Sequence, residues 1–150
     1  MSSHIAARSP ETIELVGTWR LVRASSWKNG ALRDPNELGP RVDGYITYTQ
    51  AGRMHVIIDR RSAAQLGGRY GMSQIFAYAG RYTRNGAFVT HHLEMCTVID
   101  DIGEAYVRRI ELDGEHLVLC TEAVTRGDNT YVSKLEWVLV DQLDPVGATI

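Results

Sequence analysis

Two adjacent histidines and a glutamate lie in the stretch AFVTHHLEMC, residues 87–96, and such side chains could bind a metal ion or transfer a proton. Neighbouring residues of a β-strand point to opposite faces, so His91 and His92 cannot bind one ion. The more apolar set is assigned to the interior: Val89, His91, Leu93 and Met95. His92 and Glu94 then face solvent, and no metal site is expected. What remains is one interior histidine, suited to acid–base chemistry near neutral pH.

Arg108, in the stretch AYVRRIEL at residues 105–112, is the second candidate, because alternation places it inside together with Tyr106. A buried guanidinium is costly unless it is paired. An internal ion pair, or stacking on Trp19, would be a structural explanation. The functional explanation is a clamp on a carboxylate, enolate or phenolate. For His91 the structural alternative is a core histidine that is hydrogen-bonded to a neighbour.

The expected catalytic set is thus His91, Arg108 and Tyr106. Other inward-facing side chains are expected to bind the substrate: Trp19, Arg23, Tyr48, Met54, Val56, Tyr78, Tyr82, Leu93, Tyr131 and Trp137. Alternation leaves two facings open for residues 44–49 and for residues 116–124; in the other register of the latter, Cys120 and Glu122 would turn inward. An apolar wall with a few placed polar groups is typical of a small-molecule pocket.

Short alternating segments separated by turn signals must position these residues. Eight strands are expected, at 18–27, 44–49, 53–59, 76–83, 87–96, 105–112, 116–124 and 131–140. Asn85-Gly86 is the strongest hairpin signal. Ser9 and Pro10 predict a short N-terminal helix over 9–17, and residues 60–75 suggest a short helix or a lid. The pattern predicts an all-β, eight-stranded antiparallel up-and-down barrel, with a two-sheet sandwich as the alternative.

The composition fits one soluble domain, 1–150, with a flexible tail at 1–8. The chain has 150 residues, 44% hydrophobic and 23% charged, and a net charge of −2. Without a basic cluster, a nucleic-acid partner is not expected. Neither a membrane-spanning apolar run nor a secretory signal is visible, so a cytoplasmic location is expected. Cys96 and Cys120 are interpreted as reduced thiols, with a disulfide as the alternative.

Several motifs resemble one known family. The run LVGTWRLV at 15–22 carries Gly17-x-Trp19, and GPRVDGYITYTQAGRM, FAYAGRYTRNG, VTHHLE and VRRIELDGEHLVL follow in order. Over residues 13–140 the chain resembles the bacterial and fungal lipocalin-like domain family. The resemblance implies an eight-stranded barrel with a ligand-sized lumen, and some such barrels are cofactor-free cyclases or isomerases. Lipocalins place a basic residue of the last strand over the signature tryptophan. Here the last strand offers only Lys134, which alternation places outside.

The leading functional hypothesis is therefore cofactor-independent acid–base chemistry, such as cyclisation, isomerisation or elimination, on a small hydrophobic substrate in biosynthesis. His91 would move a proton, Arg108 would hold negative charge, and the tyrosines would orient the substrate. The competing hypothesis is a non-catalytic carrier or sensor of a small hydrophobic ligand. A third is a structural barrel with a filled core. No cofactor, metal or membrane partner is expected, and a homodimer is possible.

Overall fold

The computed structural model describes residues 8–39, 42–60 and 74–141. Within these residues the chain forms strands and one short 3-10 turn, η4 (Ile99–Asp101). The strands are β1 (Gly17–Lys28), β2 (Ala31–Asp34), β3 (Asp43–Tyr48), β4 (Arg53–Asp59), β5 (Ile75–Asn85), β6 (Phe88–Cys96), β7 (Ala105–Asp113), β8 (His116–Cys120), β9 (Val124–Arg126) and β10 (Asn129–Asp141).

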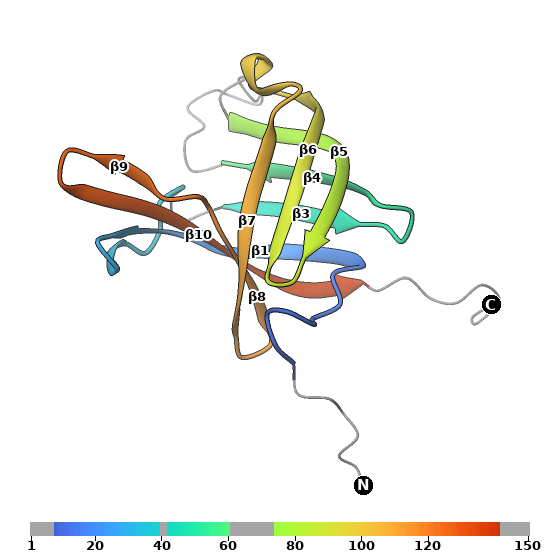
Figure 1. Ribbon diagram of the computed structural model, residues 1–150, viewed down its shortest axis with the longest axis horizontal. Helices are drawn as coiled ribbons and strands as arrows, with labels where there is room; N and C mark the ends of the chain where they lie inside the picture. The colour runs from blue at the N-terminus through green and yellow to red at the C-terminus, as the bar shows by residue number, and fades with distance from the viewer. Residues whose placement is uncertain (1–7, 40–41, 61–73, 142–150) are drawn as a thin grey trace, which may run out of the picture.

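Eight of these strands close into an antiparallel barrel, in the order β1-β3-β4-β5-β6-β7-β8-β10, and β10 pairs back onto β1 (Figure 1). Closure leaves these strands without a free edge. The expected up-and-down barrel is confirmed. Two short strands were not predicted: β2 pairs with β1, and β9 forms a hairpin with β10 that projects to the left of the barrel in Figure 1.

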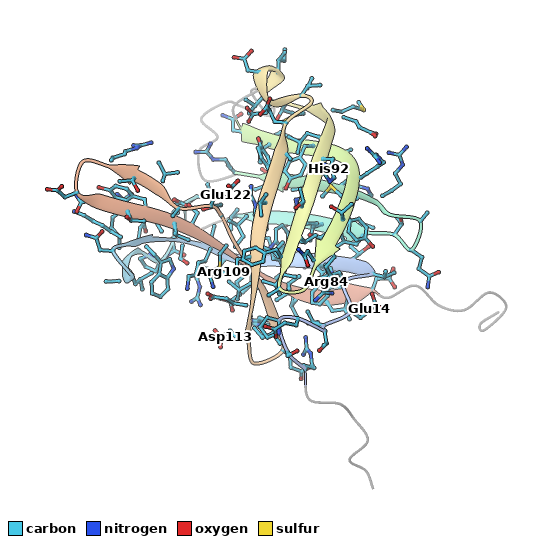
Figure 2. All side chains as sticks on the ribbon, in the orientation of Figure 1. Glu14, Arg84, His92, Arg109, Asp113 and Glu122 are labelled. Carbon is cyan, nitrogen blue, oxygen red and sulfur yellow. The ribbon has the colours of Figure 1, made fainter. Side chains whose placement is uncertain are left out.

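The expected N-terminal helix over 9–17 is wrong. One turn forms, since the Ser9 carbonyl accepts hydrogen bonds from the backbone N–H groups of Thr12 and Ile13. Beyond it the chain is extended, and Ile13, Leu15 and Trp19 are buried in alternation. Burial of these side chains at the barrel end favours the extended backbone over a helical one. Arg84 of β5 holds this segment at the same end, donating to two of its carbonyls (Figure 2).

The interior of the barrel is the face that alternation predicts over most of the chain. The core comprises Ile13, Leu15, Trp19, Leu21, Ile46, Tyr48, Met54, Val56, Ile58, Tyr78, Val89, Leu93, Ile110, Leu117, Leu119 and Trp137. His91 is buried among them, and Glu94 is exposed on the outer face. The inward facing that we favoured for residues 46, 48, 117 and 119 is confirmed.

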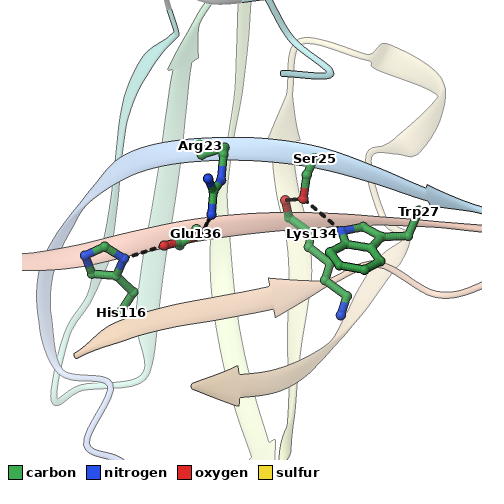
Figure 3. Close-up of polar contacts among 6 residues, drawn as sticks. All are labelled: Arg23, Ser25, Trp27, His116, Lys134 and Glu136. Atoms are coloured by element: carbon green, nitrogen blue, oxygen red, sulfur yellow. Dashed lines mark hydrogen bonds and ion pairs between the residues drawn. The ribbon is translucent and has the colours of Figure 1, made fainter. Parts of the chain in front are cut away.

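Two bulges reverse the predicted facing of particular residues. The pairing of β1 with β10 shifts between Leu21 and Arg23, so Arg23 pairs with Glu136 and turns outward. Its guanidinium lies 2.8 Å from the Glu136 carboxylate (Figure 3). Trp27 follows Arg23 onto the outer face, where its ring lies under the Lys134 ammonium group. The expected lumenal position of Arg23 is therefore wrong, as is that of Trp27.

The second bulge lies in β6. Ala79 pairs with Met95 but Gly80 pairs with Leu93, so Glu94 is the extra residue. Met95 consequently faces outward and is 68% exposed, which corrects its predicted interior position. Gly80 permits the close approach of the two strands, because a Cβ atom there would lie 1.8 Å from the His92 carbonyl oxygen.

Three further observations bear on the sequence-based expectations. Cys96 and Cys120 are both free thiols, as expected. Residues 61–73, most of the expected helix or lid, lie outside the described residues. In the described part of the chain, no helix has the length and apolar character needed to cross a membrane.

Candidate functional site

An interior cavity lies in the middle of the barrel, between strands on opposite sides of the wall. It is lined by Ile46, Val56, Ile58, Phe76, Tyr78, His91, Arg108, Leu119, Leu135 and Trp137. Its volume is about 40 Å³, room for only a few water-sized groups. The lining is aliphatic and aromatic except for His91, Arg108, the hydroxyl of Tyr78 and the indole N–H of Trp137, which is buried without a hydrogen-bond partner among the described residues. The cavity can therefore enclose a polar head group rather than a large molecule.

A larger hollow adjoins this cavity at the end of the barrel where β4 ends and β5 begins. It has a volume of about 530 Å³ and is lined by Leu38, Ile58, Arg60, Ile75, Phe76, Thr97 and Val98. Ile58 and Phe76 line both spaces, so the hollow adjoins the interior cavity.

His91 lies between two tyrosine hydroxyls. Its Nε2 atom is 2.6 Å from the hydroxyl oxygen of Tyr48 on β3, and its Nδ1 atom is 2.7 Å from that of Tyr78 on β5. His91 and Tyr48 are each 1% exposed, and Tyr78 is 6% exposed. Both nitrogens of the imidazole are thus engaged, which confirms an interior histidine with hydrogen-bonded neighbours.

The pKa values of His91, Tyr78 and Tyr48 are all shifted away from neutrality. Burial, followed by the positive charge of Arg108 and the proximity of His92, lowers the pKa of His91 to about 3. Burial raises the pKa of Tyr78 to about 12, although the Arg108 charge opposes this shift. Burial also raises the pKa of Tyr48 well above its usual value. With these shifts all three groups are neutral at physiological pH, and the pKa of His91 lies below the near-neutral value that the sequence suggested.

Arg108 extends from β7 into this lumen. Its guanidinium carbon lies 4.8 Å from the centroid of the Tyr106 ring, a cation–π contact. No carboxylate of the described residues lies within ion-pair distance of Arg108. The ring on which it stacks is Tyr106 rather than Trp19. The positive charge is therefore not neutralised by an acidic side chain of the described interior.

Tyr106 supports the site from the side. Its ring meets that of Tyr78 edge-on at a centroid distance of 5.1 Å, and its hydroxyl donates a hydrogen bond to Asp101 in η4. Burial, together with that hydrogen bond, raises its pKa. Since its hydroxyl is already committed to Asp101, Tyr106 contributes its ring to the Arg108 side of the cavity.

The structure brings together only some of the residues that we expected to bind substrate. Val56, Tyr78 and Trp137 line the cavity beside His91 and Arg108. Other members are core residues that support it without lining it: Trp19, Tyr48, Met54 and Leu93. Tyr82 packs against the core and its hydroxyl donates to the Thr49 carbonyl. Tyr131 lies on the projecting hairpin, under Arg33, away from the cavity.

Five lining residues were not among the expected site residues: Ile46, Ile58, Phe76, Leu119 and Leu135. The signal for all five is the same alternation that placed Tyr78 and His91 inside. The described residues contain no group of three or more His, Cys, Asp or Glu side chains that could hold a metal ion. The neutral Tyr78 hydroxyl and the positively charged Arg108 guanidinium are both hydrogen-bond donors at the cavity. The cavity is therefore suited to holding an oxygen-bearing group.

Together, the barrel and the cavity define the class of the protein as a closed antiparallel β-barrel with an interior cavity. The chain belongs to the lipocalin-like domain family, whose sequence model matches residues 16–140. The resemblance drawn from the sequence motifs is thereby confirmed. No curated protein and no solved structure matches the chain.

Proposed function

We propose that this barrel binds a small, mostly apolar organic molecule and holds an oxygen-bearing group of that molecule against Arg108. The observation that carries the proposal is a guanidinium in an apolar cavity with no carboxylate partner among the described residues. Arg108 is half-buried, and its partners among the described residues are the Val107 carbonyl and the Tyr106 ring. A charge withdrawn from water without an anionic partner is unfavourable, and a bound oxygen would satisfy it. Membership of a lipocalin-like family supports a binding role in general terms.

Calorimetric titration with a panel of four small aromatic probes tests this proposal. The panel comprises phenylacetate, phenylacetamide, acetophenone and toluene, which share a ring that fits an apolar hollow but differ in their oxygen group. The oxygen-bearing members should bind more tightly than toluene. In Arg108→Gln that preference should be lost, and phenylacetate should bind at least tenfold more weakly, because a hydrogen bond to a charged group is lost.

Arg109→Gln is the matched control, since the neighbouring Arg109 faces outward and pairs with Glu111. It should leave binding of the panel unchanged. Circular dichroism checks that both variants fold, and Arg108→Lys provides a second variant that retains the charge but loses the planar fork. If toluene bound as well as the oxygen-bearing probes, or if Arg108→Gln had no effect on them, the proposal would be overturned.

A cofactor-independent isomerase, cyclase or lyase is the second candidate. Tyr78 and Arg108 both lie at one cavity, where they could stabilise an oxygen that gains negative charge in an enolate-like transition state. The low pKa of His91 argues against its use as a general base, and no carboxylate of the described residues lines the cavity. These facts favour the carrier or sensor over the enzyme.

Proton exchange in D₂O separates the two candidates. A barrel that stabilises an enolate should exchange the methyl protons of bound acetophenone for deuterium faster than buffer does, as followed by proton NMR. Exchange should fall in Arg108→Gln. A carrier would bind the same probe without any acceleration of exchange.

A further inference from the structure

The hydrogen bonds of Tyr48, His91 and Tyr78 have a direction that can be worked out from their proton count. A neutral imidazole has one N–H donor and one bare acceptor nitrogen. His91 therefore donates to one tyrosine and accepts from the other. The atoms to be assigned are Nε2, which lies 2.6 Å from Tyr48, and Nδ1, which lies 2.7 Å from Tyr78.

Tyr48 decides between the two directions. It is 1% exposed, and its hydroxyl hydrogen bond within the described residues is the one to His91. If Nε2 carried the proton, the hydroxyl hydrogen of Tyr48 would be buried without an acceptor, which is costly. The favoured arrangement has Tyr48 donating to Nε2, while the N–H at Nδ1 of His91 donates to the Tyr78 oxygen.

Among the described residues, this assignment leaves the hydroxyl hydrogen of Tyr78 without an acceptor. Tyr78 lines the interior cavity, and so does Arg108. Arg108 carries only donors and cannot accept that hydrogen. The hydroxyl of Tyr78 and the guanidinium of Arg108 thus both lie at one small cavity, and the acceptor that the described residues offer Tyr78, Nδ1 of His91, is occupied by its own proton.

We propose that the inner group of the ligand is an anionic oxygen that only accepts hydrogen bonds, because the Tyr78 donor and the positive charge of Arg108 lie at the same cavity. The ligand would then be an organic acid bound as its anion. Tyr78 is the specificity-determining donor, and Tyr48 and His91 are positioning residues that fix the direction in which it donates. The inference rests on the proposed function, because it specifies which oxygen group lies against Arg108.

The dimensions of the site add a constraint on the rest of the ligand. A cavity of about 40 Å³ accommodates a carboxylate, enolate or phenolate group and little more. The apolar remainder of the ligand would lie in the larger hollow that adjoins the cavity, beside Leu38, Phe76 and Val98. The ligand class is thus an amphipathic organic acid whose charged end enters the barrel first.

Long-range ¹H–¹⁵N NMR of the whole protein tests the hydrogen-bond direction without any ligand. His91 is assigned among the five histidines as the imidazole whose signals change in Tyr48→Phe. The expected spectrum shows a protonated Nδ1 and a bare Nε2 in the wild type. A proton on Nε2 would overturn the inference, whatever the binding data.

Binding of the aromatic panel tests the ligand class. Phenylacetate should bind at least tenfold more tightly than phenylacetamide and acetophenone at pH 7. Tyr78→Phe should reduce phenylacetate affinity about tenfold and bring it close to that of the amide. Tyr48→Phe should also lower the ratio of acid to amide affinity, because Tyr78 could then donate to His91 instead of to the ligand.

Tyr45→Phe serves as the control for loss of a phenol, because Tyr45 is an exposed residue of β3. It should leave the acid-to-amide ratio unchanged. Equal affinity for acid, amide and ketone, with all three weakened by Arg108→Gln, would overturn this inference and leave the proposed function intact. If Arg108→Gln weakened none of them, the proposed function itself would fail.

Discussion

The guanidinium carbon of Arg108 lies 4.8 Å from the centroid of the Tyr106 ring, and the hydroxyl of Tyr106 is held in turn by Asp101. The interior charge is thus held against a ring that is fixed at the connection between β6 and β7. Tyr106 also meets Tyr78 edge-on, so one ring touches both donors of the cavity. The role of Tyr106 in this arrangement depends on its ring more than on its hydroxyl.

Substitutions at Tyr106 should separate these two contributions. Tyr106→Phe keeps the ring under Arg108 and should change phenylacetate affinity less than twofold. Tyr106→Leu removes the cation–π contact and should weaken binding about fivefold, in line with the modest strength of such contacts. Calorimetry measures both. A large loss in the Phe variant would show that the hydroxyl itself acts on the ligand.

Arg23→Gln should leave ligand binding within twofold of the wild type. Arg23 faces the outer wall, where it pairs with Glu136 at 2.8 Å, and it is separated from the cavity by the sheet (Figure 3). Arg108→Gln, with the same change of charge, should weaken binding at least tenfold. If both variants lost affinity equally, the effect would be one of overall charge rather than of a contact in the lumen.

Gly80→Ala should destabilise the barrel by about 1–3 kcal/mol, the usual cost of overpacking a filled site. The added Cβ atom would meet the His92 carbonyl oxygen at 1.8 Å, so the backbone must shift at the β6 bulge. Urea unfolding measures the change. Thr83→Ala, on an exposed position of the same strand, should change stability by less than about 0.5 kcal/mol. Equal stability of Gly80→Ala and wild type would exclude this tight approach.

The sequence was most informative where the strands are regular. In β7, and in β6 as far as Leu93, alternation placed His91 and Arg108 inside and His92 outside, as the structure has them. The errors at Arg23 and Met95 both follow bulges, because one extra residue reverses every later side chain of a strand. Gly80 is compatible with such a bulge, but many strand glycines serve other purposes, so the pattern alone does not locate it.

The site itself was less predictable than the fold. Alternation identified Tyr48, Tyr78 and His91 as interior residues, yet it carries no information on which of them touch across the barrel. That contact depends on the stagger of strands far apart in the sequence. The packing across the barrel also buries His91, and this burial lowers its pKa. Similarly, Ser9 and Pro10 predicted a helix from local preferences. Burial of Ile13 and Leu15 at the barrel end is a tertiary effect that overrides them.

Phenylacetate affinity should be constant between about pH 5 and 9. His91, with a pKa of about 3, and Tyr78, with a pKa of about 12, do not change charge in this range. Below about pH 4.3, the usual pKa of a carboxylic acid, the ligand itself becomes protonated and its affinity should fall. Calorimetry across this range measures the profile. A transition near pH 6.5 would instead indicate a His91 of ordinary basicity.

Stability should fall as the pH is lowered through the pKa of unfolded histidine. In the folded protein burial lowers the pKa of His91 to about 3, whereas the unfolded chain takes up a proton at about pH 6.5. The unfolded state therefore binds one more proton between these values. The free energy of unfolding should then decrease by about 1.4 kcal/mol per pH unit below pH 6.5. Above pH 6.5 both states are neutral, and this contribution is fully present.

Urea unfolding at pH 7, 6 and 5 measures this slope, in a range where most carboxylates remain ionised in both states. His91→Gln, which cannot take up a proton, should be less stable at pH 7 but should lose the slope between pH 6 and 5. His55→Gln, a substitution at an exposed histidine of β4, should keep it. An unchanged slope in His91→Gln would assign the proton uptake to other residues and would show that His91 is as basic in the folded barrel as in the unfolded chain.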